Sequence, residues 1–274
     1  MFAEPAAPRA GSGNFPGGAI AYAREAFAIA EVELRKLRRD PTELVTRSVQ
    51  PALWLMVFGQ VFGRLRGIPT GGLSYLAFMS PGILAQSVLF IAIFYGIVVI
   101  WERDLGLLQK QLVTPAARSA LVLGKGVSAG IRGLAQALII YLLTILLGVP
   151  LSLAPLNVLG VLAMVLLGSA LFSTFSLVIA CLMKTRERFM GIGQVLTMPL
   201  FFASNAIYPL AMMPDWLRAV ASFNPLSYQV DALRALMVRG GASAFGLGAD
   251  FAVQGVVLVV LVAIAARLYP EVAI

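Results

Sequence analysis

Residues 101–125, WERDLGLLQKQLVTPAARSALVLGK, form a polar stretch in a chain that is otherwise largely apolar. Residues 75–100 before it carry no charge, and residues 126–149 after it carry only Arg132. Each flanking segment is longer than the ~18 apolar residues that cross the hydrocarbon core of a bilayer as a helix. The sequence therefore predicts two membrane spans joined by a polar segment.

Within this polar stretch, Leu105, Leu108 and Leu112 recur at spacings of three and four residues. This spacing places them on one side of a helix, so we predict a short amphipathic helix over residues 104–113. Pro115 ends it, because the residue before a proline avoids the helical conformation. An amphipathic helix between two spans predicts a contact surface for another molecule, and a solvated loop on lipid headgroups is the alternative.

The composition assigns the chain to one class. Apolar residues make up 59% of the 274 residues and charged residues 12%, about half the share found in soluble domains. We predict an all-α, polytopic membrane protein. The sequence contains no histidine, the commonest general base and metal ligand, and Cys181 is its single cysteine, which excludes an internal disulfide. The placement of the basic residues explains the net charge of +8 by membrane topology, so no nucleic-acid partner is predicted.

Six spans are predicted within one transmembrane permease domain over residues 42–274. They cover approximately residues 44–62, 75–100, 126–147, 156–183, 189–208 and 251–268. Residues 1–18 are rich in Ala, Gly and Pro, which predicts a disordered tail. Residues 19–41 have apolar positions three and four apart and a basic end, which predicts an amphipathic helix in the headgroup plane or a docking surface for a partner.

The basic residues indicate the orientation of the spans. With the N-terminus in the cytoplasm, 15 Lys and Arg residues fall on the cytoplasmic side and 5 on the outer side. Basic residues favour the cytoplasmic loops of membrane proteins. We therefore predict a multi-pass protein of the cytoplasmic (inner) membrane with both termini and residues 101–125 in the cytoplasm.

The outer segment between the fifth and sixth spans is predicted to form two short helices. Pro214 begins the first, and Asn224 ends it and caps the second, whose first position is Pro225. The segment also contains aromatic side chains of the kind that gather at a membrane interface. We predict a re-entrant hairpin, with a plain outer loop as the alternative. Its principal residues are Pro209, Pro214, Trp216, Asn224, Pro225 and Tyr228.

The predicted spans contain no group that would drive transport. The chain lacks the GxxxxGK[ST] phosphate loop. Ion-coupled transport uses carboxylates inside spans, whereas the acidic residues nearest to these spans are placed at span ends or in loops: Glu102, Asp104, Glu187 and Asp250. The polar residues inside the spans are predicted to bond between helices: Gln86, Gln136, Gln194, Asn205 and Gln254. We therefore expect an energy source outside this chain.

Two blocks of the sequence resemble one family of membrane proteins. Residues 102–108, ERDLGLL, with LVTP at 112–115 and LGK at 123–125, are similar to a pattern of type-2 ABC-transporter permeases. Residues 208–217, YPLAMMPDWL, and 223–234, FNPLSYQVDALR, resemble the outer region of the same family. Its members export drugs, lipids and polysaccharides, and include daunorubicin-resistance and nodulation-factor export permeases. The resemblance covers nearly the whole chain.

This resemblance implies a permease subunit and not an enzyme. A separate ABC ATPase would dock on the cytoplasmic face and carry ATP and Mg, with no cofactor on this chain. A second copy, or a homologous permease, would complete the transporter in membrane lipid. The implied ATPase-coupling residues are Glu102, Arg103, Asp104, Leu105, Gly106, Leu108, Leu112 and Pro115. Candidate substrate-path residues, for which ordinary packing is the alternative, are Phe90, Phe94, Tyr95, Phe201, Phe202 and Asn205.

The implied function is ATP-driven export by alternating access. The aromatic and weakly polar spans favour a hydrophobic or amphiphilic substrate, such as a drug or lipid. A polysaccharide or lipo-oligosaccharide is the alternative substrate. A stand-alone secondary transporter is disfavoured because it would need a coupling carboxylate in a span. A membrane-embedded enzyme is disfavoured further, because it would need a nucleophile and a base within a span.

Overall fold

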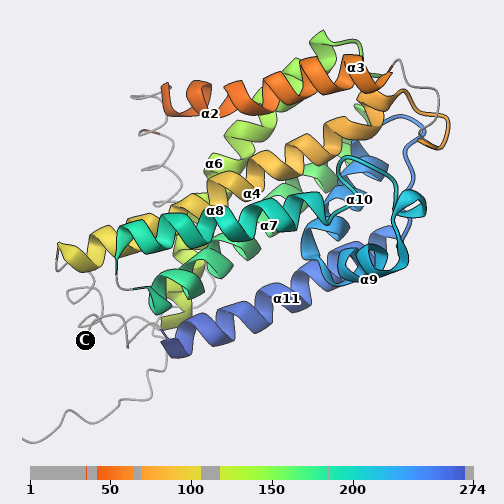
Figure 1. The fold of residues 1–274 in the computed structure, drawn as a ribbon. Coiled ribbons are helices and arrows are strands. Elements are labelled where there is room, and N and C mark those ends of the chain that lie inside the picture. Colours follow the sequence, from red (N-terminus) through yellow and green to blue (C-terminus); the bar gives the residue numbers. More distant parts are fainter. Residues whose placement is uncertain (1–34, 36–41, 64–68, 106–117, 184, 269–274) are drawn as a thin grey trace, which may run out of the picture.

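A computed structural model of the chain describes residues 35, 42–63, 69–105, 118–183 and 185–268. Its long helices run side by side and reverse direction from one to the next (Figure 1). In chain order the elements are α2 Thr42–Leu53, η1 Trp54–Phe58, α3 Gly59–Gly63, α4 Tyr75–Asp104, α6 Arg118–Leu146, α7 Pro155–Leu182, α8 Arg186–Phe202, η2 Leu210–Met212, α9 Asp215–Phe223, α10 Pro225–Met237 and α11 Leu247–Leu268. The described residues contain no sheet beyond one isolated bridge between Leu151 and Val238, so the all-α class is confirmed for them.

Four of these helices are long and apolar enough to cross a membrane. They include Tyr75–Val98 of α4, Lys125–Leu146 of α6, all of α7 and all of α11. These segments coincide with the second, third, fourth and sixth predicted spans. Their length agrees with the ~20 residues that a helix needs to cross a bilayer.

The centre of the bundle lies between α4 and α7. Ser74 caps α4, because its Oγ accepts a hydrogen bond from the amide of Ala77 at 3.2 Å. The two helices approach closely at Gly96, whose amide donates to Oγ of Ser176 at 3.1 Å. A β-carbon on Gly96 would overlap this hydroxyl, so the close contact requires glycine. Phe172 on α7 is among the large side chains that are fully buried here.

The first predicted span is interrupted in the structure. Its helical course passes from α2 into η1, a π-helical segment, and then into the short α3. Pro51 lies just before η1 and lacks an amide hydrogen, so it interrupts the regular hydrogen bonding of the helix. A reciprocal pair ties α2 to α6: Gln136 Nε2 donates to Ser48 Oγ at 3.0 Å, and Ser48 Oγ lies 3.3 Å from Gln136 Oε1. That this segment crosses the membrane stays a prediction.

The fifth predicted span is shorter than expected. It was predicted to reach residue 208, but α8 has 17 residues and ends at Phe202. Asn224 Nδ2 donates to the carbonyls of Leu200 and Ala203 at 2.7 and 3.1 Å. These carbonyls belong to the end of α8, and bonding them to Asn224 satisfies the helix end at that point. The crossing of the membrane by α8 also stays a prediction.

The outer segment forms the two predicted short helices, α9 and α10. Asn224 lies at the break between them, and its Oδ1 accepts a hydrogen bond from the amide of Leu226 at 3.0 Å. Pro225 occupies the first turn of α10, so the predicted cap and helix start are confirmed. α10 packs against α4, α7 and α11, and most of its residues are buried. The depth of this hairpin in a membrane stays a prediction.

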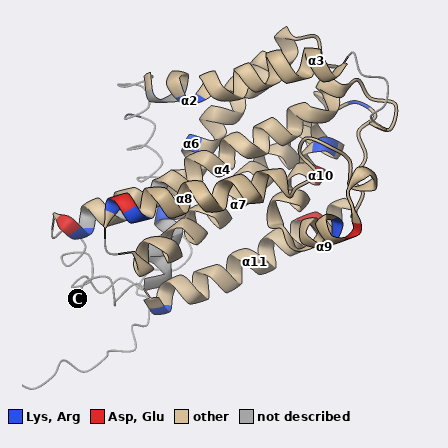
Figure 2. Cartoon of the chain, in the orientation of Figure 1, with Lys and Arg blue, Asp and Glu red and all other residues tan. Residues whose placement is uncertain are grey.

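Charged residues of the described chain lie mostly toward the two ends of the bundle (Figure 2). The ribbon between them is formed largely by apolar and small polar residues, as a membrane domain requires. Two predicted helices lie outside the described residues. They are the N-terminal amphipathic helix over residues 19–41, of which only Arg35 is described, and the helix over residues 104–113 beyond Leu105.

Candidate functional site

The last turn of α4 joins the beginning of α8 and the end of α7. Asp104 Oδ2 lies 2.9 Å from Nη2 and 3.0 Å from Nε of Arg186. Arg103 Nη1 donates to the carbonyl of Met183 at 3.0 Å. The Arg186 guanidinium also lies 5.3 Å from the centre of the Trp101 ring. Both partners of the ion pair are more than a third exposed, so we expect it to contribute only ~0–1 kcal/mol to stability.

This cluster, which we call the α4-end cluster (Trp101, Arg103, Asp104, Met183 and Arg186), contains part of the predicted coupling set. Leu105 follows it directly and is 70% exposed. Glu102 belongs to α4, but its side chain is not described. Four further members lie outside the described residues: Gly106, Leu108, Leu112 and Pro115. Sequence reasoning missed Arg186, because 82 residues separate it from Asp104.

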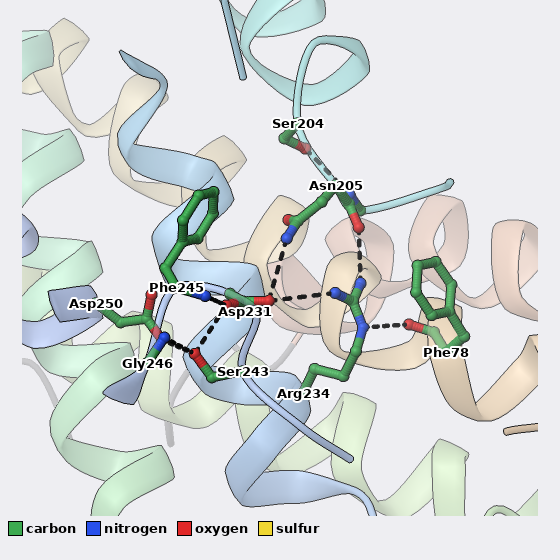
Figure 3. Close-up of polar contacts among 10 residues, drawn as sticks. Phe78, Ser204, Asn205, Asp231, Arg234, Ser243, Phe245, Gly246 and Asp250 are labelled. Atoms are coloured by element: carbon green, nitrogen blue, oxygen red, sulfur yellow. Dashed lines mark hydrogen bonds and ion pairs between the residues drawn. The ribbon is translucent and has the colours of Figure 1, made fainter. Parts of the chain in front are cut away.

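A second polar cluster (Figure 3) is buried beside Phe78, near the start of α4 and opposite to the end that contains Asp104. Arg234 on α10 is 6% exposed. Its Nε donates to the carbonyl of Phe78 at 3.3 Å, and its Nη2 donates to the carbonyl of Asn205 at 2.7 Å. Its Cζ lies 3.9 Å from the centre of the Phe78 ring. Burial lowers the pKa of Arg234 to about 10, and the charge of Asp231 acts in the opposite direction, so the guanidinium stays charged at neutral pH.

Asp231, one turn before Arg234, balances this charge and is 1% exposed. Its Oδ1 lies 3.8 Å from Nη1 of Arg234 and accepts from Nδ2 of Asn205 at 3.4 Å. Its Oδ2 accepts from Ser243 Oγ at 2.8 Å and from the amide of Phe245 at 3.0 Å. Buried ion pairs are tolerated when further hydrogen bonds satisfy their remaining polar atoms. This pair therefore fixes α10 against α4 and against the chain that leads into α11.

Asp250 extends the buried cluster onto α11. It lies in the first turn of that helix, is 0% exposed, and has its Oδ2 2.9 Å from Ser243 Oγ. Asp250 thus lies at the end of the sixth predicted span, as expected from the sequence, but α11 begins at Leu247, before the predicted start at residue 251, and the carboxyl group is buried. Arg234 was counted among the outer loop residues, and it is instead packed inside the bundle. The spacing of Asp231 and Arg234 by three residues within an apolar helix was the signal for a buried pair.

The predicted path residues fall into separate environments. Phe202 lines a pocket of about 650 Å³, which we call the aromatic pocket. Phe90 and Phe94 line a pocket of about 310 Å³, which we call the amide pocket. Phe201 is fully buried, and Asn205 belongs to the cluster around Arg234. The side chain of Tyr95 is not described.

The aromatic pocket is bounded largely by rings. Trp54 and Phe58 are stacked with centroids 4.6 Å apart, and Phe58 and Phe62 are stacked with centroids 5.6 Å apart. These three residues recur every fourth position through η1 and α3, so their rings form one ladder along a single side. Tyr75 at the start of α4 and Phe202 at the end of α8 complete the ring-lined wall.

The amide pocket lies farther along the same three segments. α2 contributes Arg47 and Gln50, α4 contributes Gln86 beside its two phenylalanines, and α8 contributes Gln194. Gln86 is 2% exposed, and its Oε1 has no hydrogen-bond partner among the described residues. Both pockets therefore lie along one seam between α2–α3, α4 and α8, and residues 207–217 form the remaining side of the aromatic pocket.

The sequence is similar to a known family of membrane transporters and to several of its members. Residues 24–238 match the family described as ABC-2 type transporter. The chain belongs to this family. It is 30% identical to the ycf38 transport permease of Cyanophora paradoxa over 78% of this chain and 74% of that protein. It is 24% identical to the daunorubicin resistance ABC transporter permease protein DrrB1 of Streptomyces coeruleorubidus, over 84% of this chain and 80% of that protein. It is 28% identical to nodulation protein J of Rhizobium leguminosarum bv. trifolii, over 71% and 74% of the two chains.

Membership makes this ABC-2 permease the membrane subunit of an ABC exporter. It is a multi-pass membrane protein and not itself the catalytic subunit, and membership of the family implies pairing with an ABC ATPase subunit. Among its described residues, no three His, Cys, Asp or Glu side chains come together as a metal site.

Two of the four glutamines predicted inside the spans form hydrogen bonds between helices. Gln136 bonds to Ser48, as described above, and Gln254 Nε2 on α11 donates to the carbonyl of Pro225 on α10 at 2.6 Å. These contacts confirm the predicted interhelical role for both glutamines. Gln194 on α8 is exposed, and with Gln86 it belongs to the wall of the amide pocket.

Proposed function

We propose that this ABC-2 permease moves a hydrophobic or amphiphilic substrate outward along the seam between α2–α3, α4 and α8. The observation that carries the proposal is the succession of two pockets of different polarity along that seam. A path of this kind suits a molecule with an apolar body and a polar group, since ligand sites combine apolar walls with a few placed polar groups.

The two pockets offer complementary chemistry. In the amide pocket, Gln50, Gln86 and Gln194 supply hydrogen-bonding groups close to the rings of Phe90 and Phe94. The unpartnered Oε1 of Gln86 is a buried acceptor, and a substrate hydroxyl or amine would satisfy it. The aromatic pocket would then receive the apolar part of the substrate at the next stage of the path.

The stacked ladder favours this substrate class over a polysaccharide. Sugar rings bind on the open faces of aromatic side chains, whereas Trp54, Phe58 and Phe62 stack on one another and cover part of those faces. A lipo-oligosaccharide is the second substrate class, because its acyl chain would fit the apolar wall.

Alternating access would be driven by the partner ATPase, which would hold ATP and Mg. The helix predicted over residues 104–113 would dock on that ATPase through its leucines. α4 connects this region to the path, because Phe94 and Asp104 are ten residues apart on one helix, about 15 Å along its axis. A displacement of the docked helix would therefore reach the amide pocket through α4.

The surroundings of the permease follow from the same proposal. A second copy or a homologous permease would face the seam and close the path. Lipid would cover the exposed apolar side of α11, where Val256, Val259 and Val260 are 64%, 69% and 52% exposed. We further propose an inner-membrane location with both termini in the cytoplasm, and a re-entrant hairpin formed by α9 and α10.

The proposal can be tested with permease and ATPase reconstituted together in liposomes. The probes are a planar aromatic amphiphile, a short-chain fluorescent phospholipid and a lipid-linked oligosaccharide. We expect the first two to stimulate ATP hydrolysis and to be transported. Phe58→Ala and Gln86→Leu should each weaken the apparent affinity about tenfold, equivalent to ~1.4 kcal/mol.

Phe223→Ala is the matched control, because Phe223 is 89% exposed and does not line either pocket. It should leave the affinity unchanged. Stimulation by the oligosaccharide alone, with no response to either amphiphile, would refute the proposed substrate class.

A further inference from the structure

Ser243 lies between two buried carboxylates in the chain that joins α10 to α11. Its Oγ is 2.8 Å from Oδ2 of Asp231 and 2.9 Å from Oδ2 of Asp250 (Figure 3). The same oxygen accepts a hydrogen bond from the amide of Gly246 at 2.7 Å. Three polar atoms are therefore within hydrogen-bonding distance of one hydroxyl group.

The number of hydrogens limits how this arrangement can be satisfied. A serine hydroxyl donates one hydrogen bond and accepts two. The amide of Gly246 uses one acceptor position, and the hydroxyl hydrogen can point to only one of the two carboxylates. If both carboxylates were ionised, one of the short O···O contacts would hold no hydrogen. One proton on either carboxylate removes this conflict, since its O–H then donates to Ser243.

The surroundings assign that proton to Asp250. Asp231 accepts hydrogen bonds from Asn205, Ser243 and Phe245 and lies beside the Arg234 guanidinium, so donors and a cation already occupy both of its oxygens. Asp250 has the contact with Ser243, and its Oδ1 is buried with no hydrogen-bond partner among the described residues.

Charge balance leads to the same assignment. Arg234 and Asp231 neutralise each other, so an ionised Asp250 would leave one net negative charge in a buried cluster. Asp250 lies in the first turn of α11, where the helix dipole favours a negative charge. That effect is small compared with the cost of burying an unpaired carboxylate, so the neutral acid is favoured.

We propose that Asp231, Ser243 and Asp250 form a proton-binding site that holds one proton on Asp250 and fastens α10 to α11. In this site Asp250 donates to Ser243, and Ser243 donates to Asp231. When the proton leaves, Asp250 and Asp231 are both negative and share one hydroxyl, so the attachment between the two helices weakens.

The proton has a route to solvent on one side. Asp231, Arg234 and Asn205 line a pocket of about 390 Å³, together with Ala242 and Ala244 of the chain around Ser243. The 2% exposed Asn205 has its Oδ1 in this environment with no partner among the described residues. When Ser243 passes its hydrogen to Asp231 and receives the proton of Asp250, one proton has moved to Asp231 on the pocket side and the negative charge is left on Asp250. On the proposed orientation, this pocket faces the outer side.

Few other charges reach the site. α7 contains no acidic or basic residue, and α6 has none beyond Arg132 at its midpoint. The charged residues of α4 all lie in its last turn, which is the end of the helix far from Phe78. The described charged residues of the segments next to α10, which are Asp215, Arg218 and Arg239, are exposed.

The inference is tested with the full-length permease in lipid nanodiscs, compared with Asp250→Asn. Asparagine copies the neutral acid, because its amide can donate to Ser243. Infrared difference spectra between the two proteins should show a protonated carboxyl band in the wild type at neutral pH. As pH rises from about 5 to about 9, the wild type alone should lose stability, because Asp250 ionises freely in the water-exposed unfolded chain, whereas ionisation in the folded cluster leaves an unpaired buried carboxylate. The two melting temperatures should separate by roughly 3 °C for each pH unit until Asp250 ionises in the folded state.

Ser243→Ala and Ser243→Thr provide the matched pair. Removal of the hydroxyl should lower the melting temperature of the permease at every pH, and threonine should restore it. The proposal is wrong if the wild type shows no protonated carboxyl band. It is also wrong if Asp250→Asn fails to fold, or melts below the wild type at high pH, since both results would mean that the native carboxyl is ionised. These readouts need no substrate, so they are independent of the proposed transport path.

Discussion

Asp104, the last residue of α4, forms a two-contact ion pair with Arg186, the first residue of α8, across 82 residues of sequence. The pair lies where the chain enters the polar stretch that is predicted to contact the ATPase. α4 and α8 also form two sides of the seam that contains both pockets. The ion pair therefore connects the end of the permease that is predicted to contact the ATPase to the walls of its proposed path.

Breaking this pair should uncouple the permease with little loss of stability. Asp104→Asn and Arg186→Gln should each change the free energy of unfolding by at most ~1 kcal/mol, because both side chains are partly exposed. Stimulation of ATP hydrolysis by substrate should fall in both variants. The reversed pair, Asp104→Arg with Arg186→Asp, should recover part of it. Equal stimulation in all four proteins would leave the pair without a role in coupling.

The predicted helix over residues 104–113 should bind the ATPase through its leucine side. Leu108→Asp places an unpaired charge in a contact that excludes water, so the complex should dissociate at a cost of several kcal/mol. Lys110→Glu on the opposite side of the predicted helix is the control and should retain binding. Co-purification of permease and ATPase measures both. If Leu108→Asp co-purifies normally, the stretch is a solvated loop.

The orientation of the chain can be tested by labelling single cysteines. Cys181 is the one native cysteine and is first replaced by alanine. A membrane-impermeant thiol reagent should then label Ala242→Cys in intact spheroplasts, because Ala242 is exposed at the end of the bundle assigned to the outside. Ala116→Cys should be labelled only after the membrane is opened. The opposite pattern would reverse the orientation that the basic residues predict.

The close contact of α4 with α7 should make Gly96 sensitive to a single methyl group. A β-carbon there would lie 2.1 Å from Ser176 Oγ and 2.8 Å from Phe189 Cζ. Gly96→Ala should therefore lower the free energy of unfolding by ~2 kcal/mol. Gly191→Ala on α8 is the control, because nothing lies within 4 Å of its β-carbon position. It should be neutral or stabilising by up to ~1 kcal/mol, as measured by chemical unfolding in micelles.

Export should depend on ATP and not on a proton gradient. The described carboxylates of the buried cluster, Asp231 and Asp250, both lie beside Ser243 (Figure 3) and do not form a relay across the bundle. An ionophore that collapses the gradient at constant ATP and constant outer pH should leave the transport rate largely unchanged. A stand-alone secondary transporter would lose transport under these conditions.

The sequence predicted those helices well whose apolar run or capping residue lies within or next to the helix itself. The spans over α4, α6, α7 and α11 follow from uninterrupted apolar runs, and the cap at Asn224 follows from the adjacent proline. The end of α8 could not be predicted in the same way. It depends on the side chain of Asn224, which donates a hydrogen bond to the carbonyl of Ala203. The two residues are 21 positions apart in the sequence, so no local pattern indicates the contact.

The sequence did not predict the buried cluster of Asp231, Arg234 and Asp250, because it shows where charged residues occur but not whether the fold encloses them. Arg234 resembles a loop residue in sequence, and only the packing of α10 against α4 shows that it is enclosed. The sequence predicts Asp250 at a span end or in a loop, but it does not indicate that the chain around Ser243 buries this carboxyl group. The aromatic path residues were separated for a related reason, since neighbours such as Phe201 and Phe202 point to different environments.

The two ends of α8 are held by different contacts, so we expect one end to move more easily than the other. The Arg186 end is joined by an exposed ion pair, whereas the carbonyls of the other end are held by the buried amide of Asn224. With 17 residues, the helix is about 25 Å long. A tilt of about 10° around the Asn224 end would move the Arg186 end by ~4 Å and Gln194, near its middle, by ~2 Å. The end held by Asn224 would then stay in place while the Arg186 end moves, and the amide pocket would widen or narrow with that movement.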